Sequence, residues 1–446
     1  MFFMMLVYIV FFIIRPQDYP AVAEGAAPPY QQIALLMAGG FWLFARHKRT
    51  DSPQHILLFA FYIVLMLSSM ANGWFGGALV QLEKFGPALL AFFVLAAGLD
   101  SASRMRTVMA TFCLCAVVLA VHGIEQASVG IGWTGVGLSQ GTRIQYVGVF
   151  NDPNDLGMLF VMCIPMALYL SGQGGLMGLR RLVWLAVAIV LGWGIVLTNS
   201  RGTMLAVLVM LGVYLWKVRG PVYAGIIASF SLVGLLMLPS RMQDMDVSEA
   251  SAMGRVESWY EGLQMFRSAP FLGIGPDRYS DHYNLTAHNS FVLVLAETGV
   301  IGFTLWLAFV IYCFQMMRVG LTGSAQAMGY GESEASTDVM PEDTDPDVEE
   351  ESMVRSVLHE EDRRIALTLF VSLAGFFTCA FFLSRSYLIL PYLLAAMAVA
   401  HYACMRRNAP DLPMFTLGRD FLRWPIVVAV AIVGFFVLVK ILLVTA

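Results

Sequence analysis

Long apolar segments separated by short polar connections follow one another along most of the chain. A segment of about 20 apolar residues is long enough to cross a bilayer as an α-helix, so the pattern predicts about 13 transmembrane helices, give or take one. They are expected at residues 1–14, 30–45, 54–71, 76–99, 107–126, 154–172, 181–198, 202–217, 221–239, 289–314, 365–383, 386–404 and 425–444. The first segment lacks a basic start and a small-residue cleavage site, so we expect a retained helix rather than a signal peptide.

Composition agrees with this pattern. Hydrophobic residues make up 58% of the 446 residues and charged residues only 13%, with a mean hydropathy of +0.71. A soluble chain of this length could not bury that much apolar surface in one core. The sequence therefore predicts an all-α polytopic membrane protein.

The basic residues predict how the helices are oriented. Alternate connections carry the clusters Arg46-His-Lys-Arg49, Arg104 with Arg106, Arg180-Arg181, Lys217 with Arg219, Arg318 with Arg363-Arg364, and Arg406-Arg407. The positive-inside rule places these connections in the cytoplasm. The N-terminus is then cytoplasmic, the C-terminus external, and the long loop 240–288 external.

Several arginines lie on the outer side against that rule, namely Arg143, Arg201, Arg241, Arg255, Arg267 and Arg278. Arg201 occupies a four-residue break between two segments that are each long enough to span. A guanidinium held at the membrane face is costly, and charges there usually serve function. We therefore interpret Arg201 as part of an anion site.

Loop 240–288 contains a predicted amphipathic helix. Its apolar residues Val256, Trp259, Tyr260, Leu263 and Phe266 recur at helical spacing. The helix should end near Pro270, and a tight turn made possible by small residues should follow over 271–276. We interpret the helix as a lid, and a simple membrane-surface connector is the alternative.

His288 opens the next predicted helix. The helix dipole disfavours imidazolium at that position, so the ring should be neutral near pH 7 and able to accept a proton. The alternative is that Asn289 or Ser290 only caps the helix and His288 is an interfacial residue. Glu297, further along, is expected to be a buried hydrogen-bonding residue.

Other polar groups lie near the outer ends of the helices. Asp152 and Asp155 have the spacing of a helix cap around Pro153, which explains most of that motif. Asn151 and Asn154 remain possible contacts for sugar hydroxyls. Glu83, Lys84, His122 and Glu125 also lie near outer helix ends, where charged groups usually face the interior of the bundle. Together with the asparagines they predict a polar cavity under the lid.

Residues 321–364 form an acidic segment with 13 Asp and Glu against 3 Arg. The segment has few large apolar residues, so we expect a disordered cytoplasmic loop with a short helix near its end. A solvated spacer is favoured over a regulatory or docking segment. The six cysteines all lie within or at the ends of apolar segments, and the sequence has neither a phosphate-cradling loop nor a metal-binding motif, so no cofactor is expected.

Four motifs together resemble a known family. They are Asn199-Ser-Arg-Gly202, Gly254-Arg-Val-x-x-Trp259, Ala269-Pro-Phe-Leu-Gly-Ile-Gly-Pro276, and His288-Asn-Ser followed by Glu297-x-Gly299-x-x-Gly302. In this order, over roughly residues 140–315, the sequence resembles the O-antigen ligase and polymerase superfamily of bacterial membrane glycosyltransferases.

The resemblance implies a C-class glycosyltransferase-like membrane fold and transfer of a glycan from a polyprenyl diphosphate carrier to an acceptor hydroxyl. The reaction would be metal-independent and inverting, at the periplasmic face of the inner membrane. Arg201 and Arg255 would stabilise the leaving diphosphate and His288 would be the base. The expected substrate contacts are Arg278, Arg143, His282, Asn289 and Asn154.

The chain is accordingly divided into N-terminal helices (1–126), a catalytic core (127–320), the acidic loop (321–364) and C-terminal helices (365–446). The sequence leaves three acceptors possible. A ligase would use lipid A core, a polymerase a second carrier-linked repeat, and a protein O-oligosaccharyltransferase a Ser or Thr hydroxyl. A transporter of lipid-linked glycan is the alternative from another class. It is disfavoured because no inverted repeats are visible.

Overall fold

The structure of the protein is a computed structural model. It describes residues 1–23, 28–45, 48, 50–173, 175, 178–226, 229, 245–322 and 346–445. Within these ranges the chain is helical, and its only β pairing is two isolated bridges in the loop after residue 130. The expected all-α fold is confirmed.

Ten helices in the described ranges are long and apolar enough to cross a membrane. They are α4 (Pro53–Ala71), α5 (Phe75–Gly98), α6 (Ala102–Val129), α7 (Pro153–Ser171), α8 (Leu179–Leu197), α9 (Arg201–Arg219), α13 (Ser290–Thr322), the second part of α14 (Pro346–Ala380), α15 (Ile389–Asn408) and α17 (Arg423–Thr445). Together with the composition, they make the chain a multi-pass membrane protein.

The structure does not support the expected number of about 13 spans. The segments at 1–14 and 30–45 are helical, but α1 (Phe2–Ile14) and α3 (Tyr30–Leu43) have only 13 and 14 residues. A helix of that length is shorter than the roughly 20 residues that a bilayer core requires. The predicted segment 221–239 lies largely outside the described residues.

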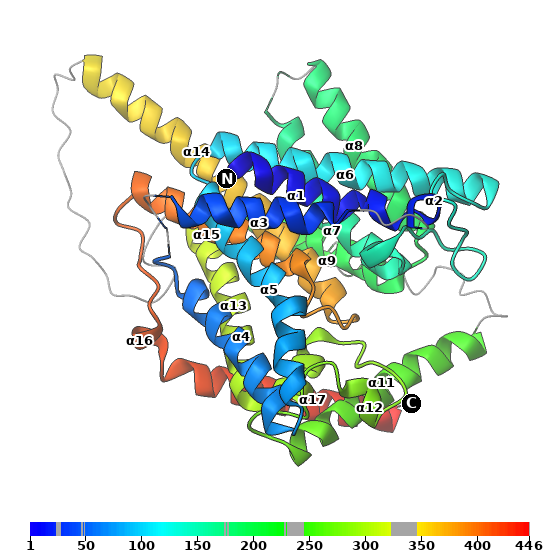
Figure 1. The fold of residues 1–446 in the computed structure, drawn as a ribbon. Coiled ribbons are helices and arrows are strands. Elements are labelled where there is room, and N and C mark those ends of the chain that lie inside the picture. Colours follow the sequence, from blue (N-terminus) through cyan, green and yellow to red (C-terminus); the bar gives the residue numbers. More distant parts are fainter. Residues whose placement is uncertain are drawn as a thin grey trace.

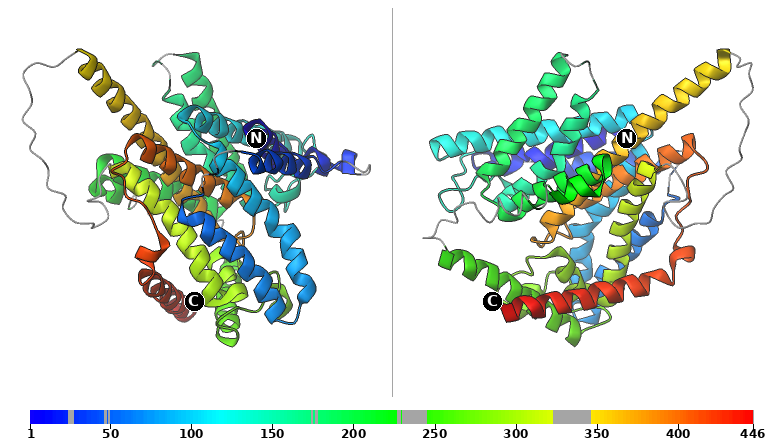
Figure 2. Two further views of the ribbon diagram at one scale, coloured as in Figure 1. Left: turned by 60° about the vertical axis from the view of Figure 1, so that its left-hand side comes forward. Right: turned by 180° about the vertical axis from the view of Figure 1, so that it is seen from behind.

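The remaining elements complete the described chain. They are η1 (Pro16–Asp18), α2 (Pro20–Ala23), η2 (Gly148–Phe150), α11 (Met245–Ser268), α12 (Tyr279–His282) and α16 (Leu417–Asp420). Helix α7 lies at the centre, in contact with α6, α8 and α14 (Figure 1). Helices α4, α5 and α13 run together beside this group (Figure 2).

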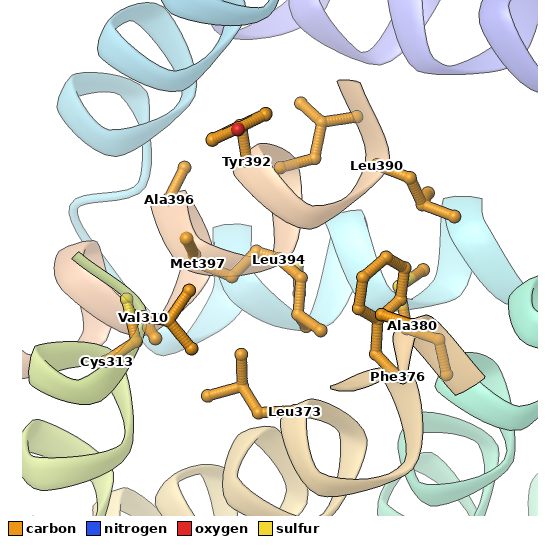
Figure 3. Packing of buried hydrophobic residues seen from close by; sticks show 14 of the residues in the cluster. Val310, Cys313, Leu373, Phe376, Ala380, Leu390, Tyr392, Leu394, Ala396 and Met397 are labelled. Carbon is orange, nitrogen blue, oxygen red and sulfur yellow. The ribbon is translucent and has the colours of Figure 1, made fainter. Parts of the chain in front are cut away.

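Part of the buried core joins α13, α14 and α15. Figure 3 shows Val310 and Cys313 of α13 near Leu373 of α14 and Met397 of α15, and all four side chains are buried. Branched, aromatic and sulfur-containing side chains fill this space at high density. The two C-terminal helices α14 and α15 are therefore part of the core that supports the rest of the bundle.

Polar contacts gather at both ends of α7, whose 19 residues separate them by about 28 Å. At the C-terminal end the Tyr169 hydroxyl donates to Glu361, which also pairs with Arg106 at 2.7 Å. The Arg407 guanidinium donates to the Asp100 carbonyl at the same end of the bundle, where Arg407 and Glu361 line one cavity. Arg106 and Arg407, from two of the connections predicted to be cytoplasmic, thus lie at the same end of the bundle.

Helix α13 is broken at Gly299, whose φ of 64° is not helical. The backbone groups freed by the break bond to the turn after α11. Ile274 and Gly275 donate to the carbonyls of Ala296 and Glu297, each at 3.0 Å, and Val300 donates to the Pro270 carbonyl at 2.8 Å. The turn at residues 269–276 and the Gly299 break in α13 therefore form a single structural unit.

Helix α11 ends at Ser268, as the following proline predicts. Trp259 and Leu263 are buried, and the helix packs against α13 and α17 (Figure 1). Tyr260 is 41% exposed, so it does not share the buried face as the periodicity suggested. A residue next to Trp259 points about 100° away on a helix, which explains the difference.

The acidic segment is only partly described. Residues 323–345 lie outside the described residues, and 346–364 form the first part of α14, which continues without a break to Ala380. The C-terminal part of the expected loop is thus an extension of a core helix.

Candidate functional site

The N-terminal end of α7 joins the link between α14 and α15 through an ion pair. The Nε and Nη2 atoms of Arg385 donate to the two carboxylate oxygens of Asp155 at 2.6 and 2.7 Å. A carboxylate oxygen of Asp152 lies 3.8 Å from Nη2. Fork-shaped pairing of this kind fixes both position and orientation of a guanidinium.

The same link is bonded to the beginning of α13. The Ser290 hydroxyl donates to the Leu383 carbonyl at 2.6 Å and accepts from the Arg385 backbone amide at 3.0 Å. The Ser386 hydroxyl donates to the Ser290 carbonyl at 2.8 Å. Because His288 is only two residues before Ser290, these bonds bring the histidine to the end of α7 that carries Asp155.

Asn289 caps α13, since its side-chain oxygen accepts from the amides of Phe291 and Val292 at 2.9 and 3.1 Å. Capping by Asn289 was the alternative interpretation of this motif. The Asn289 side-chain oxygen therefore has a structural role at the start of α13. His288, just before the cap, has a left-handed backbone with φ 46°. That conformation is uncommon for a residue other than glycine.

His288 is half-buried and lies among charged groups. Burial lowers its pKa below the ordinary value, and the positive charge of Arg255 lowers it further. The negative charge of Asp152 raises the pKa, and Arg385 again lowers it. The lowered pKa favours a neutral imidazole near pH 7, which can accept a proton.

Arg255 reaches this region from α11. Burial lowers its pKa, Asp152 raises it and nearby Arg201 lowers it, and the guanidinium nevertheless keeps its charge because no protein environment deprotonates arginine near neutral pH. Arg201 is the first residue of α9 and is exposed, after a cap in which the Ser200 hydroxyl accepts from the Thr203 amide at 3.3 Å. The two arginines predicted from separate motifs therefore lie near each other.

Arg143 joins the group from the loop before α7. It donates to the Thr198 carbonyl at 2.9 Å and to the side-chain oxygen of Asn154 at 3.0 Å. Asn154 in turn donates to Asp152 at 2.8 Å, and Asp152 caps α7 through the Asn154 amide. Burial lowers the pKa of Arg143, on which the charges of Asp152 and Arg255 also act.

The assembled cluster consists of His288, Arg143, Arg201, Arg255, Arg385, Asp152, Asp155 and Asn154; we call it the arginine cluster. Four guanidiniums against two carboxylates leave a formal charge of +2 when the histidine is neutral. A partly buried site with this excess attracts anions and holds them by bidentate hydrogen bonds.

Two predicted contacts have partners elsewhere. Arg278 donates to the Asn72 carbonyl at 3.3 Å and pairs with Asp281, and the exposed His282 lies 3.0 Å from the Arg278 carbonyl. His282 thus bonds within the segment that follows α11, and Arg278 also ties this segment to the end of α4. Their predicted contacts to substrate stay predictions.

The groups expected to form one polar cavity instead bond in two separate loops. Lys84 pairs with Asp277 at 3.0 Å, which ties α5 to the turn after α11. His122 lies 2.8 Å from the Thr134 hydroxyl, in the loop after α6, and Glu125 accepts from the backbone of that same loop. His122 is fully buried and is a core residue.

Arg385 and the pairing of Asp155 were not predicted. The signal was present, because Ser384-Arg385-Ser386 interrupts two long apolar segments in the same way as the break at Arg201. Asp155 was interpreted only as a capping residue, since its partner is 230 positions away in the sequence.

Comparison with known proteins identifies one part of the chain. Residues 185–307 match the sequence model of a family described as O-antigen ligase. The match includes Arg201, Arg255 and His288, and it leaves out Arg143, the start of α7 and Arg385. A search of curated proteins finds no match.

Proposed function

Residues 185–307 belong to the O-antigen ligase family of membrane glycosyltransferases, and from that premise we propose a reaction for the protein. It transfers a glycan from a polyprenyl diphosphate carrier to a hydroxyl group of an acceptor. The site is the arginine cluster. We place it at the periplasmic face of the bacterial inner membrane, with the N-terminus in the cytoplasm, because the basic connections cluster at the other end of α7.

The convergence of Arg255 with His288 is the observation that carries the proposal. Arg255 lies in α11, whereas His288 lies two residues before the start of α13, and the charge of Arg255 lowers the pKa of His288. A diphosphate leaving group needs fixed positive charge where its own charge develops, and a partly buried guanidinium supplies it without reorganisation. Arg201, which acts on Arg255, adds a second charge from the start of α9.

The reaction then has a defined course. Neutral His288 takes the proton of the acceptor hydroxyl while that oxygen attacks the anomeric carbon of the glycan. The bond from this carbon to the diphosphate oxygen breaks, and its electron pair stays with the carrier diphosphate. Attack from the face opposite the leaving group inverts the anomeric centre. The arginines stabilise the departing diphosphate.

Helix α11 is the proposed lid. It carries Arg255 and packs through Trp259 and Leu263 onto the body of the protein, so the anion contact and the cover are on the same helix. Excluding water from this site matters because hydrolysis of the carrier bond is the competing reaction.

The acceptor distinguishes three versions of the proposal. The ligase version, which uses lipid A core, is the one we favour from the family match. A second carrier-linked repeat would make the protein a polymerase, and a Ser or Thr hydroxyl would make it a protein O-oligosaccharyltransferase. All three use the same donor chemistry.

The deciding experiment offers purified protein in detergent a polyprenyl diphosphate-linked glycan together with each acceptor class. We expect the donor to be consumed and the glycan to appear on one acceptor. A transporter would leave the donor unchanged, because detergent solution has no second compartment. Loss of one glycoconjugate after deletion of the gene would then identify the acceptor in the cell.

A further inference from the structure

We propose that Arg385, fixed by Asp155, is a third arginine that contacts the carrier diphosphate. The inference rests on the proposed function, but it concerns a residue in the link between α14 and α15, well beyond the stretch that matches the family. It assigns to the C-terminal helices a share in the site itself.

Asp155 holds the Arg385 guanidinium in one orientation and leaves its Nη1 donors without a short hydrogen bond to the protein. Its Nε and Nη2 atoms are engaged by Asp155 at 2.6 and 2.7 Å, whereas Nη1 has only a long contact of 3.5 Å to the adjacent Ser384 carbonyl. The Arg385 side chain is 30% exposed and Asp155 only 2%. The carboxylate therefore forms the buried support, and the remaining donors of the arginine can meet a ligand.

A purely structural role explains less. The link is already docked by the three hydrogen bonds of its residues 383–386 with Ser290, none of which uses the Arg385 side chain. A buried ion pair is a costly way to add stability, since apolar residues of similar volume often serve as well. Charge at this position is better explained by an anionic ligand.

The location agrees with that ligand. The charge of Arg385 acts on His288 in the same direction as the charge of Arg255. His288 is therefore faced by Arg255 from α11, Asp152 from the start of α7 and Arg385 from the α14–α15 link. A diphosphate between Arg255 and Arg385 would place the leaving group beside the proposed base.

The test uses paired variants so that no unmatched buried charge is created. Arg385→Gln with Asp155→Asn removes the pair and leaves the formal charge of the cluster at +2. The control is Arg106→Gln with Glu361→Gln, an ion pair at the other end of α7 whose arginine is exposed to a similar degree, 33% against 30% for Arg385. The probe is a short-chain polyprenyl diphosphate binding to the purified full-length protein, with the corresponding polyprenyl alcohol as the uncharged reference.

We expect the Arg385–Asp155 double variant to bind the diphosphate roughly 10- to 100-fold more weakly, since a hydrogen bond to a charged group is lost. The control double variant should bind within about twofold of the wild type, and Arg385→Lys should recover part of the loss. Equal binding by the Arg385–Asp155 double variant and the wild type would overturn the inference.

A second readout separates positioning from structure. Removing the Arg385 charge in the same double variant should raise the pKa of His288, which the charge of Arg385 lowers, so the acid limb of kcat/KM should move to higher pH. An unmoved limb with unchanged diphosphate binding counts against the proposal. If the wild type binds the diphosphate but transfers no glycan, the proposed function fails, and the Arg385 assignment stands where the double variant binds the diphosphate more weakly than the wild type. If the wild type does not bind it, both fail.

Discussion

Gly273 and Gly299 pack backbone against backbone, at the point where the turn after α11 enters the break in α13. Both have positive φ, of 69° and 64°. A Cβ atom on Gly273 would overlap the backbone of Glu297, and one on Gly299 would overlap the carbonyl of Phe271. No side-chain rotation relieves a clash with backbone, so the close approach of the two segments requires glycine at both positions.

The first prediction follows from this contact. Gly273→Ala or Gly299→Ala should lower the free energy of unfolding by about 2 kcal/mol or more, because each adds a backbone clash at a left-handed position. Thermal unfolding in detergent measures the effect. Gly434→Ala in α17 is the control, since a Cβ there meets nothing within 4 Å. Equal melting temperatures for all three variants would contradict the packing.

The second prediction concerns the two arginines nearest the proposed leaving group. Arg201→Ala or Arg255→Ala should lower turnover roughly 30- to 1000-fold, which corresponds to a loss of about 2 to 4 kcal/mol of transition-state stabilisation. Lysine at either position should recover only part, because the bidentate fork is lost. Turnover of a lipid-linked glycan by folded, purified variants is the measurement.

Arg267→Ala is the matched control for Arg255, because it lies on the same helix, is exposed and bonds to nearby Gln264. Its turnover should stay within about twofold of the wild type, as expected for a surface substitution. Normal turnover in both site variants would remove the main physical support for diphosphate transfer.

The third prediction concerns the base. His288→Ala should reduce turnover by about 10²- to 10⁴-fold and leave donor binding nearly unchanged, because a general base acts on the acceptor. The control is Arg267→Ala, since Arg267 is exposed and bonds to nearby Gln264 on α11. Near-full turnover without His288 would show that the base is another group.

The pH dependence of the wild type tests the same assignment. The base must be neutral, so activity is lost as pH falls through the pKa of His288. Burial and Arg255 lower that pKa, and the acid limb of kcat/KM should therefore lie below the ordinary histidine value of about 6.5. A limb clearly above 6.5 would mean that the titrating group is not His288 in this environment.

The fourth prediction concerns orientation. A cysteine at Ser280, which is exposed in the loop after α11, should react with a membrane-impermeant reagent in cells with a permeabilised outer membrane. A cysteine at Ala335, in the acidic segment outside the described residues, should react only after the inner membrane is opened. The basic clusters predict this result. The opposite labelling pattern would reverse the proposed topology.

The amino-acid sequence alone determined the class of fold, and it indicated Arg201, Arg255 and His288 as candidate site residues. Apolar runs of spanning length can only be helices in a bilayer, since every backbone group there must bond within its own segment. Local signals were also sufficient for the cap at Asp152 and the end of α11 at Ser268, because each depends on neighbours within a few residues. The pKa of His288 is lowered instead by burial and by the charge of Arg255 on another element, neither of which the helix-dipole argument included.

Contacts between distant parts of the chain required the tertiary structure. Asp155 has the local spacing of a capping residue, and only the packing of α14 beside α7 brings Arg385 to it. The break in α13 at Gly299 is likewise explained only by the turn at Gly273, which packs against it and bonds to its freed backbone groups. Lys84 and His122 likewise bond in different places, since Lys84 pairs with Asp277 in the turn after α11 and His122 bonds to Thr134 in the loop after α6. Side-chain type and spacing define what a residue can bond to, and the packing of helices decides which of those partners lies within reach.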